Sequence, residues 1–155
     1  MTPIGPPEIV TQKRVIKLFE EELGYEYLGD FQQRSNNSNI EEEYLKSFLQ
    51  KSGYSYNLIN KALHELKNEA NNHNRSLYDN NKAVYSLLRY GVRAKEEAGK
   101  NTQTVKLIDW ENPENNDFLI AEEVTLQGNH ERRPDLVLYI NGLAIGVIEL
   151  KNSRV

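Results

Sequence analysis

The sequence predicts a mixed α and β fold in which a helical amino-terminal half precedes a mixed, mainly antiparallel sheet. Up to about residue 100, apolar side chains recur with the period of an α-helix, and beyond that point they follow the period of β-strands. Helices followed by strands are typical of an α+β or mixed α/β domain. The length of 155 residues suits one domain. We therefore expect residues 1–100 to form a mainly helical part and residues 101–155 a sheet.

Four helices are expected in the first part. The first covers residues 8–23, because six apolar side chains recur at near-helical spacing between two prolines and Gly24. The second follows the polar segment 36–39 and ends at Gly53. The third covers about residues 55–70, and the fourth runs from about residue 80 to residue 90.

Strands are expected at residues 104–108, 118–126, 135–140 and 143–150. Asn141-Gly142 stands between the last two and is a strong signal for a β-hairpin. The chain ends shortly after the last strand, although a sheet of this pattern needs a covering helix on its exposed face. We therefore expect the chain to be truncated after this strand, or the natural polypeptide to continue.

Composition excludes several classes of protein. No apolar run approaches the roughly 20 residues that span a bilayer, so no membrane association is expected. The sequence contains no cysteine, which excludes disulfides and thiolate metal sites and is compatible with a cytoplasmic protein. The formal net charge is −4, so tight binding to DNA would have to depend on other parts of an assembly.

The residues that indicate chemistry are Pro134-Asp135 and, across the expected hairpin, Glu149-Leu150-Lys151. Residues two apart in a strand point to the same face, so Glu149 and Lys151 project together. Two carboxylates are suitable ligands for Mg²⁺, for which Mn²⁺ can substitute, and such a metal activates water for phosphodiester hydrolysis. The lysine could orient that water or stabilise the transition state. Asp135, Glu149 and Lys151 are therefore the candidate catalytic residues, and the alternative is an ordinary surface Glu–Lys pair.

Convergence of the two carboxylates depends on the hairpin. With a regular two-residue turn at Asn141-Gly142, Asp135 would pair with Ile148 and face away from Glu149. Convergence requires an odd loop, such as a three-residue loop with Gly142 left-handed, or a β-bulge. We predict the odd loop.

Residues 132–153, RRPDLVLYINGLAIGVIELKNS, strongly resemble the amino-terminal nuclease region of the R subunits of type I restriction–modification enzymes. Their order Pro-Asp and then Glu-Leu-Lys is similar to the PD-(D/E)xK nuclease signature. The resemblance extends to residues 8–30, 81–92 and 105–125, and thus covers most of the chain.

This resemblance implies a restriction-endonuclease-like core and the activity of a type I site-specific deoxyribonuclease. Such subunits bind double-stranded DNA, assemble with methylation and specificity subunits, and carry ATP-driven motor domains after the nuclease region. Asp135 and Glu149 match the metal-binding carboxylates, Lys151 the motif lysine, and the backbone carbonyl of Leu150 a further metal ligand. No phosphate-binding GxxxxGK[ST] motif occurs here, so ATP binding belongs to the motor domains that this chain lacks.

Several other residues are weaker candidates. The resemblance suggests Glu8 as an acidic residue that supports the metal site, although a glutamate is also favoured at a helix start by the helix dipole. Arg132, Arg133 and Arg154 flank the motif and could contact DNA phosphates, or could be solvated surface residues. For the whole chain, the alternatives are a repair or recombination nuclease on the same core and a non-catalytic docking module.

Overall fold

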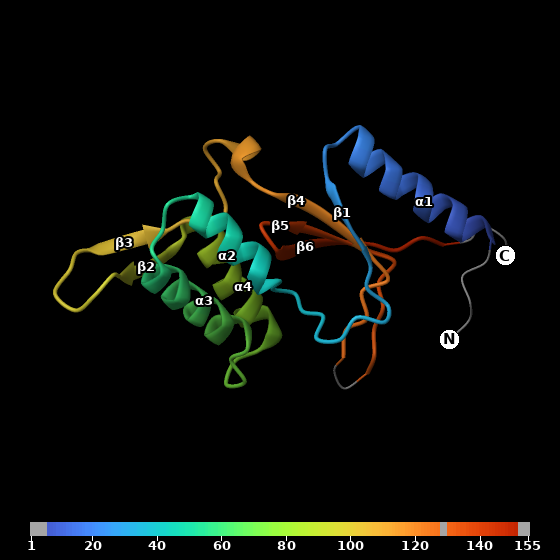
Figure 1. Ribbon diagram of the computed structural model, residues 1–155. Coiled ribbons are helices and arrows are strands. Elements are labelled where there is room, and N and C mark those ends of the chain that lie inside the picture. Colours follow the sequence, from blue (N-terminus) through green and yellow to red (C-terminus); the bar gives the residue numbers. More distant parts are fainter. Residues whose placement is uncertain (1–5, 128–129, 152–155) are drawn as a thin grey trace. The chain divides into compact units, whose positions relative to one another are not determined.

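One helix and a four-stranded sheet form the unit that carries the candidate site. The computed structural model describes residues 6–127 and 130–151. This unit, unit 1, comprises the described residues of Met1–Glu41 and Asp117–Val155. Its strands have the order β1-β4-β5-β6, with β1 parallel to β4 and the other neighbours antiparallel (Figure 1). Its elements are α1 (Pro6–Glu21), β1 (Glu26–Asp30), β4 (Phe118–Glu122), β5 (Leu136–Ile140) and β6 (Leu143–Ile148).

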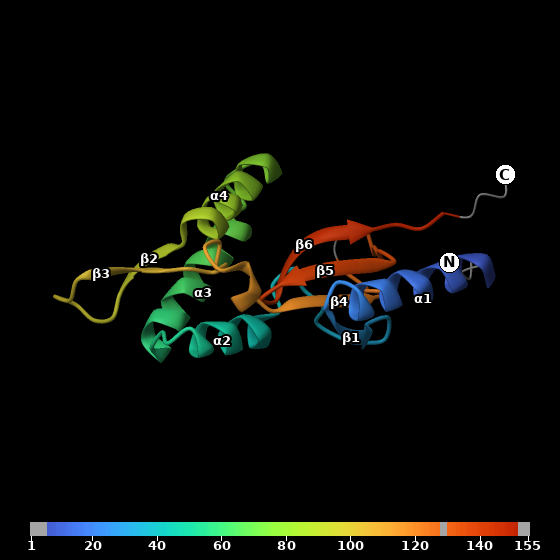
Figure 2. The same ribbon diagram turned by 90° about the horizontal axis from the view of Figure 1, so that it is seen from above.

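Helix α1 packs against one face of this sheet. Ile16 of α1 forms a buried cluster with Ile120 of β4 and Leu136 of β5. Ile148 of β6 also packs against this cluster. Figure 2 shows α1 running beside the strands. Burial of these side chains fixes which face of each strand is turned to the core, and hence which face is left for the site.

The second unit, Glu42–Asn116, is inserted in the sequence between β1 and β4. It contains α2 (Glu42–Lys51), α3 (Tyr56–Ala70), α4 (Leu77–Tyr90), an antiparallel pair of strands, β2 (Val92–Lys95) and β3 (Thr102–Val105), and the short helix η1 (Pro113–Asn115). Its core is apolar and comes mainly from α2 and α3, which bury Leu45, Phe48, Leu49, Leu58, Ile59, Ala62, Leu63 and Leu66. None of the candidate catalytic residues lies in this unit.

The predicted fold class is confirmed, because the helices come mainly from the first part of the chain and the sheet is mixed and mainly antiparallel. Helix α4 begins at Leu77, before the expected start, because Ser76 caps it by accepting a hydrogen bond from the Asp79 N–H (3.1 Å). The expected strand 118–126 stops at Glu122, since Glu123 adopts a left-handed conformation with φ of 52°. Among the described residues, no helix is both long and apolar enough to cross a bilayer.

Gly91, which ends α4, gives a test of the packing in the second unit. Its φ is 83°, and a Cβ atom there would lie 2.8 Å from the carbonyl oxygen of Val105 and 2.7 Å from Cγ2 of Thr104. We expect Gly91→Ala to lower the free energy of unfolding by roughly 2 kcal/mol or more, because strain and a clash with backbone add together. The measurement is urea unfolding followed by circular dichroism.

Gly53→Ala is the matched control for this prediction. Gly53 also has a left-handed φ, 87°, but nothing lies within 4 Å of its added Cβ. Gly53→Ala should therefore lower the free energy of unfolding only by the conformational strain, about 1 kcal/mol. Equal losses of stability in the two variants would contradict the close contact at Gly91.

Candidate active site

The β5–β6 hairpin brings Asp135 and Glu149 to the same face of the sheet. The last registered pair of the two strands is Leu136 with Ile148. Continuing this antiparallel register by one residue sets Asp135 opposite Glu149. Because Leu136 and Ile148 face the α1 core, the residues that flank them project from the other face. Continued in this way, the register makes the two carboxylates cross-strand neighbours, which agrees with the electrostatic influence of Asp135 on Glu149.

This arrangement depends on a β-bulge and not on an odd loop. Ile140 pairs directly with Leu143, so the loop contains only Asn141 and Gly142, with φ of 53° and 84°. The prediction of an odd loop is thus wrong: both residues have the positive φ that a type I′ hairpin turn requires. The extra residue is Ile145, because Tyr139 pairs with Ala144 and Leu138 with Gly146. A bulge, the other arrangement considered, supplies the change of face that convergence needs.

Asp135 is held from two sides by backbone amides. Its Oδ2 atom accepts a hydrogen bond from the Leu150 N–H at 2.6 Å. Its own carbonyl oxygen accepts one from the Glu123 N–H at 2.9 Å. The first contact ties Asp135 to the Glu149-Leu150-Lys151 segment, and the second ties it to the end of β4.

The electrostatics of Glu149 show that the three candidate groups influence one another. Partial desolvation raises the pKa of the Glu149 carboxyl, the Asp135 carboxylate raises it further, and the Lys151 ammonium opposes the rise. Glu149 makes no hydrogen bond or ion pair with another residue in ranges 6–127 and 130–151. Two neighbouring carboxylates with incomplete neutralisation favour a cation between them. The donor set therefore fits a divalent metal ion with a preference for oxygen.

A titration of Glu149 without divalent ions tests this proximity. We expect its pKa to lie above the ordinary glutamate value of 4.5. Lys151→Met should raise the pKa further by removing a favourable charge, and Asp135→Asn should lower it by removing a repulsive one. Carbon-13 NMR of the Glu149 carboxyl measures all three values. A pKa that neither substitution moves would mean that the groups lie too far apart to share a ligand.

The protein would supply only part of a metal coordination sphere. No group of three His, Cys, Asp or Glu side chains in the described part of the chain is arranged to hold a metal ion. Mg²⁺ commonly takes one or two carboxylates and fills its remaining positions with water and phosphate oxygens. Asp135 and Glu149 satisfy that requirement, and the predicted ligand role of the Leu150 carbonyl stays a prediction.

The other predicted site residues lie in different surroundings. Lys151 is exposed, and Glu8 is half-buried in the first turn of α1. Arg132 is exposed, whereas the Arg133 side chain is only 11% exposed and pairs with Glu123 at 2.8 Å. Arg154 lies outside the described residues. The proposed roles of these residues in binding metal or DNA stay predictions.

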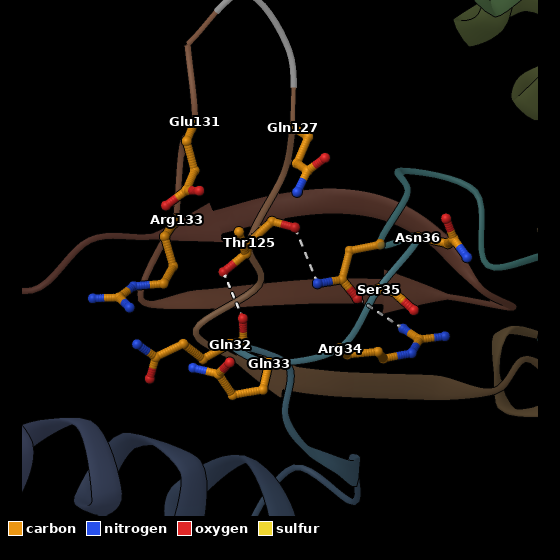
Figure 3. Close-up of a pocket in the computed structure, with 10 residues that line it drawn as sticks. Gln32, Gln33, Arg34, Ser35, Asn36, Thr125, Gln127, Glu131 and Arg133 are labelled. Carbon is orange, nitrogen blue, oxygen red and sulfur yellow. Dashed lines mark hydrogen bonds between the residues drawn. The ribbon is translucent and has the colours of Figure 1, made fainter.

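Arg133 also lines a polar pocket of about 660 Å³ beside residues 32–37 (Figure 3). Thr125 is one of the lining residues, and its hydroxyl donates to the carbonyl oxygen of Gln32 at 3.1 Å. Asp135, Glu149 and Lys151 are not among the residues that line it. The pocket is thus separate from the candidate catalytic groups, and its lining residue Arg133 pairs with Glu123.

Sequence reasoning missed two buried polar residues near Asp135. Gln12 on α1 is 4% exposed, and Glu123 after β4 is 5% exposed. Gln12 donates to Glu122 at 2.8 Å and to Glu123 at 3.1 Å. Gln12 lies one helical turn before the buried Ile16, and so on the apolar face of the helix. A polar side chain in this position was the sequence signal that could have indicated its burial.

Comparisons with known proteins show the family of this chain. The model of the family described as type I restriction enzyme R protein N terminus matches residues 7–155. A proposed type I restriction enzyme MjaVIIIP endonuclease subunit from Methanocaldococcus jannaschii is 36% identical over 115 residues, 74% of this chain and 11% of that protein. A proposed MjaIXP endonuclease subunit from the same organism is 42% identical over 79 residues, 47% of this chain and 8% of that protein.

A bacterial relative shows the same similarity. The type I restriction enzyme HindI endonuclease subunit of Haemophilus influenzae is 34% identical over 76 residues, which are 46% of this chain and 7% of that protein. The chain thus spans only about a tenth of the length of these relatives. The family match covers all the candidate residues, from Glu8 to Arg154. The chain belongs to the family of type I restriction enzyme R protein amino termini.

Proposed function

We propose that this chain is the metal-dependent endonuclease domain of a type I restriction enzyme R subunit and hydrolyses phosphodiester bonds of double-stranded DNA. The observation that carries the proposal is the convergence of Asp135 and Glu149 across the bulged hairpin, with Lys151 close enough to influence Glu149. Membership of the R-protein family supports it. A surface Glu–Lys pair alone would favour the ionised glutamate, whereas partial desolvation and the Asp135 charge raise the pKa of Glu149.

In this proposal each group has one task. Asp135 and Glu149 hold Mg²⁺, or Mn²⁺ in its place, with the Leu150 carbonyl as a further ligand. When bound, the metal lowers the pKa of a water molecule and offsets negative charge on the phosphate. Lys151 orients the attacking water or stabilises the charge that develops on the phosphate oxygens. Hydrolysis forms a bond between the water oxygen and phosphorus and breaks the bond to the leaving deoxyribose oxygen.

The acidic balance of the chain fits a domain that does not bind DNA tightly by itself. Its net charge of −4 provides little general attraction for phosphates. We propose that the DNA is delivered by ATP-driven motor domains of the same subunit, that methylation and specificity subunits complete a cytoplasmic assembly, and that the DNA sequence is recognised by the specificity subunit.

Lys151→Ala in the full-length subunit, assembled with its partners, tests the function. We expect DNA cleavage to fall by at least about 100-fold, as for the loss of other transition-state stabilisers, while ATP hydrolysis continues. Lys17→Ala is the control, because Lys17 is an exposed lysine of α1 paired with Glu21. Cleavage that survives in Lys151→Ala would contradict the assignment.

A further inference from the structure

Asp135 lies next to a buried polar network that the proposed reaction does not use. The network joins α1 to two segments near the other end of the chain: the residue after β4 and the residues before β5. Gln12 donates to Glu123 Oε1 at 3.1 Å, and the Nε atom of Arg133 pairs with Glu123 Oε2 at 2.8 Å. Each oxygen of the Glu123 carboxylate thus has a partner, one that precedes Glu123 in the sequence and one that follows it.

Burial makes this network costly unless it is complete. Glu123 is 5% exposed and Gln12 4% exposed, and the Arg133 side chain is 11% exposed. A buried carboxylate without partners is strongly unfavourable, and breaking a buried pair leaves an uncompensated charge.

The backbone of Glu123 is also unusual. Its φ is 52°, a left-handed conformation that non-glycine residues rarely adopt. In this conformation its N–H donates to the carbonyl oxygen of Asp135 at 2.9 Å. Strained backbone of this kind persists only where the surroundings hold it, and it is common beside functional sites.

We propose that Gln12, Glu123 and Arg133 form a clamp that positions Asp135 for metal binding. The side chains of the clamp fix Glu123 in its strained conformation, and the Glu123 amide then holds the backbone of Asp135. The Asp135 carboxylate is in turn aligned on the Leu150 N–H. Glu123 and Arg133 are therefore positioning residues, and Arg133 acts through Glu123. The metal-binding part of this inference rests on the proposed function, whereas the positioning of Asp135 does not.

Amide hydrogen exchange tests the positioning without any metal. Glu123→Gln removes the ion pair but keeps an oxygen that can accept from Gln12. We expect the Leu150 and Glu123 amides, both of which donate to Asp135, to exchange at least about tenfold faster in this variant, because local opening becomes easier. The amide of Leu63, in the second unit, should be unchanged.

Glu41→Gln is a matched control within unit 1. Glu41 is also a buried glutamate, 6% exposed, and it pairs with Arg34 at 2.8 Å. In Glu41→Gln, the Leu150 amide should exchange no faster relative to the most protected amides of unit 1. This ratio of exchange rates should equal that of the original chain. Unchanged exchange at Leu150 in Glu123→Gln, or equal acceleration in the two variants, would overturn the clamp.

Mn²⁺ affinity, measured by calorimetry, distinguishes this inference from the proposed function. Loss of a partner that orients a metal ligand commonly lowers metal affinity by about 10- to 100-fold, which we expect for Glu123→Gln. Saturating Mn²⁺ should restore binding in that variant. If Leu150 exchange accelerates but the original chain shows no binding that depends on Asp135, the proposed function fails while the clamp stands. If Mn²⁺ binds through Asp135 and neither exchange nor affinity changes in Glu123→Gln, the clamp fails alone.

Discussion

Asp135→Asn in the full-length R subunit, assembled with its partners, is expected to lower the rate of DNA cleavage by about 100-fold or more. The substitution removes one of two carboxylates that would hold the divalent ion, and transition-state charge stabilisation of this kind is worth several kcal/mol. ATP hydrolysis should continue, because the chain carries no phosphate-binding loop. Cleavage of supercoiled plasmid and release of phosphate, measured in the same reaction, give the two rates.

Asparagine is preferred to alanine because of the contact with Leu150. The Asp135 Oδ2 atom accepts from the Leu150 N–H at 2.6 Å, and an amide oxygen can still accept that bond. Asp135→Ala would remove both the charge and the hydrogen bond, and would confuse catalysis with stability. Asp30→Asn, in an exposed residue at the end of β1, is the control and should cleave normally. Normal cleavage by Asp135→Asn would remove this residue from the site.

Glu149→Gln is expected to raise the thermal stability of the metal-free chain at neutral pH and to abolish stabilisation by Mg²⁺. Burial and the Asp135 charge raise the pKa of Glu149 in the folded state, so the ionised form is disfavoured by folding. This penalty is present above the raised pKa and disappears as the pH falls below the unfolded value. The increase in Tm should therefore be seen at pH 7 and vanish near pH 3. Differential scanning fluorimetry across this pH range measures it.

The response to Mg²⁺ separates a metal site from an ordinary surface pair. A ligand that binds only the folded state raises Tm, by an amount that grows with the logarithm of its concentration divided by its Kd. The original chain should gain stability in millimolar Mg²⁺, and Glu149→Gln should gain none. Glu21→Gln, in an exposed residue of α1, should respond to Mg²⁺ as the original chain does. A Glu149→Gln chain that is less stable without metal would indicate that Glu149 has a structural role.

Much of the fold could be predicted from local sequence. The helical repeats, Gly53 as a stop signal and Asn141-Gly142 as a hairpin turn led to four helices and to the β5–β6 pair, which the structure contains. The strands β1 and β2 could not be predicted. Both are short, and β1 carries Gly29 and a register shift after Tyr27. Their stability depends on pairing with distant segments, and the local spacing of apolar side chains does not indicate such pairing.

The site was predictable in its chemistry but not in its geometry. Strand alternation indicated that Glu149 and Lys151 project together, but the face of Asp135 depended on one extra residue in the hairpin. The bulge at Ile145 lies beside Gly146, and although a glycine inside a strand often marks a bulge, it does not say which residue is extra or that the bulge forms. Glu123 was missed for a similar reason, since its burial depends on Gln12 and Arg133, which lie on other segments.

Binding of Mn²⁺ in a double-mutant cycle tests most directly whether Asp135 and Glu149 hold one ion together. Calorimetry would compare the original chain, Asp135→Asn, Glu149→Gln and the double variant. If the two carboxylates share the ion, each single substitution removes most of the binding energy and the double variant loses little more, so the effects are strongly non-additive. Independent, additive losses, or Mn²⁺ binding that neither substitution weakens, would contradict a shared metal site.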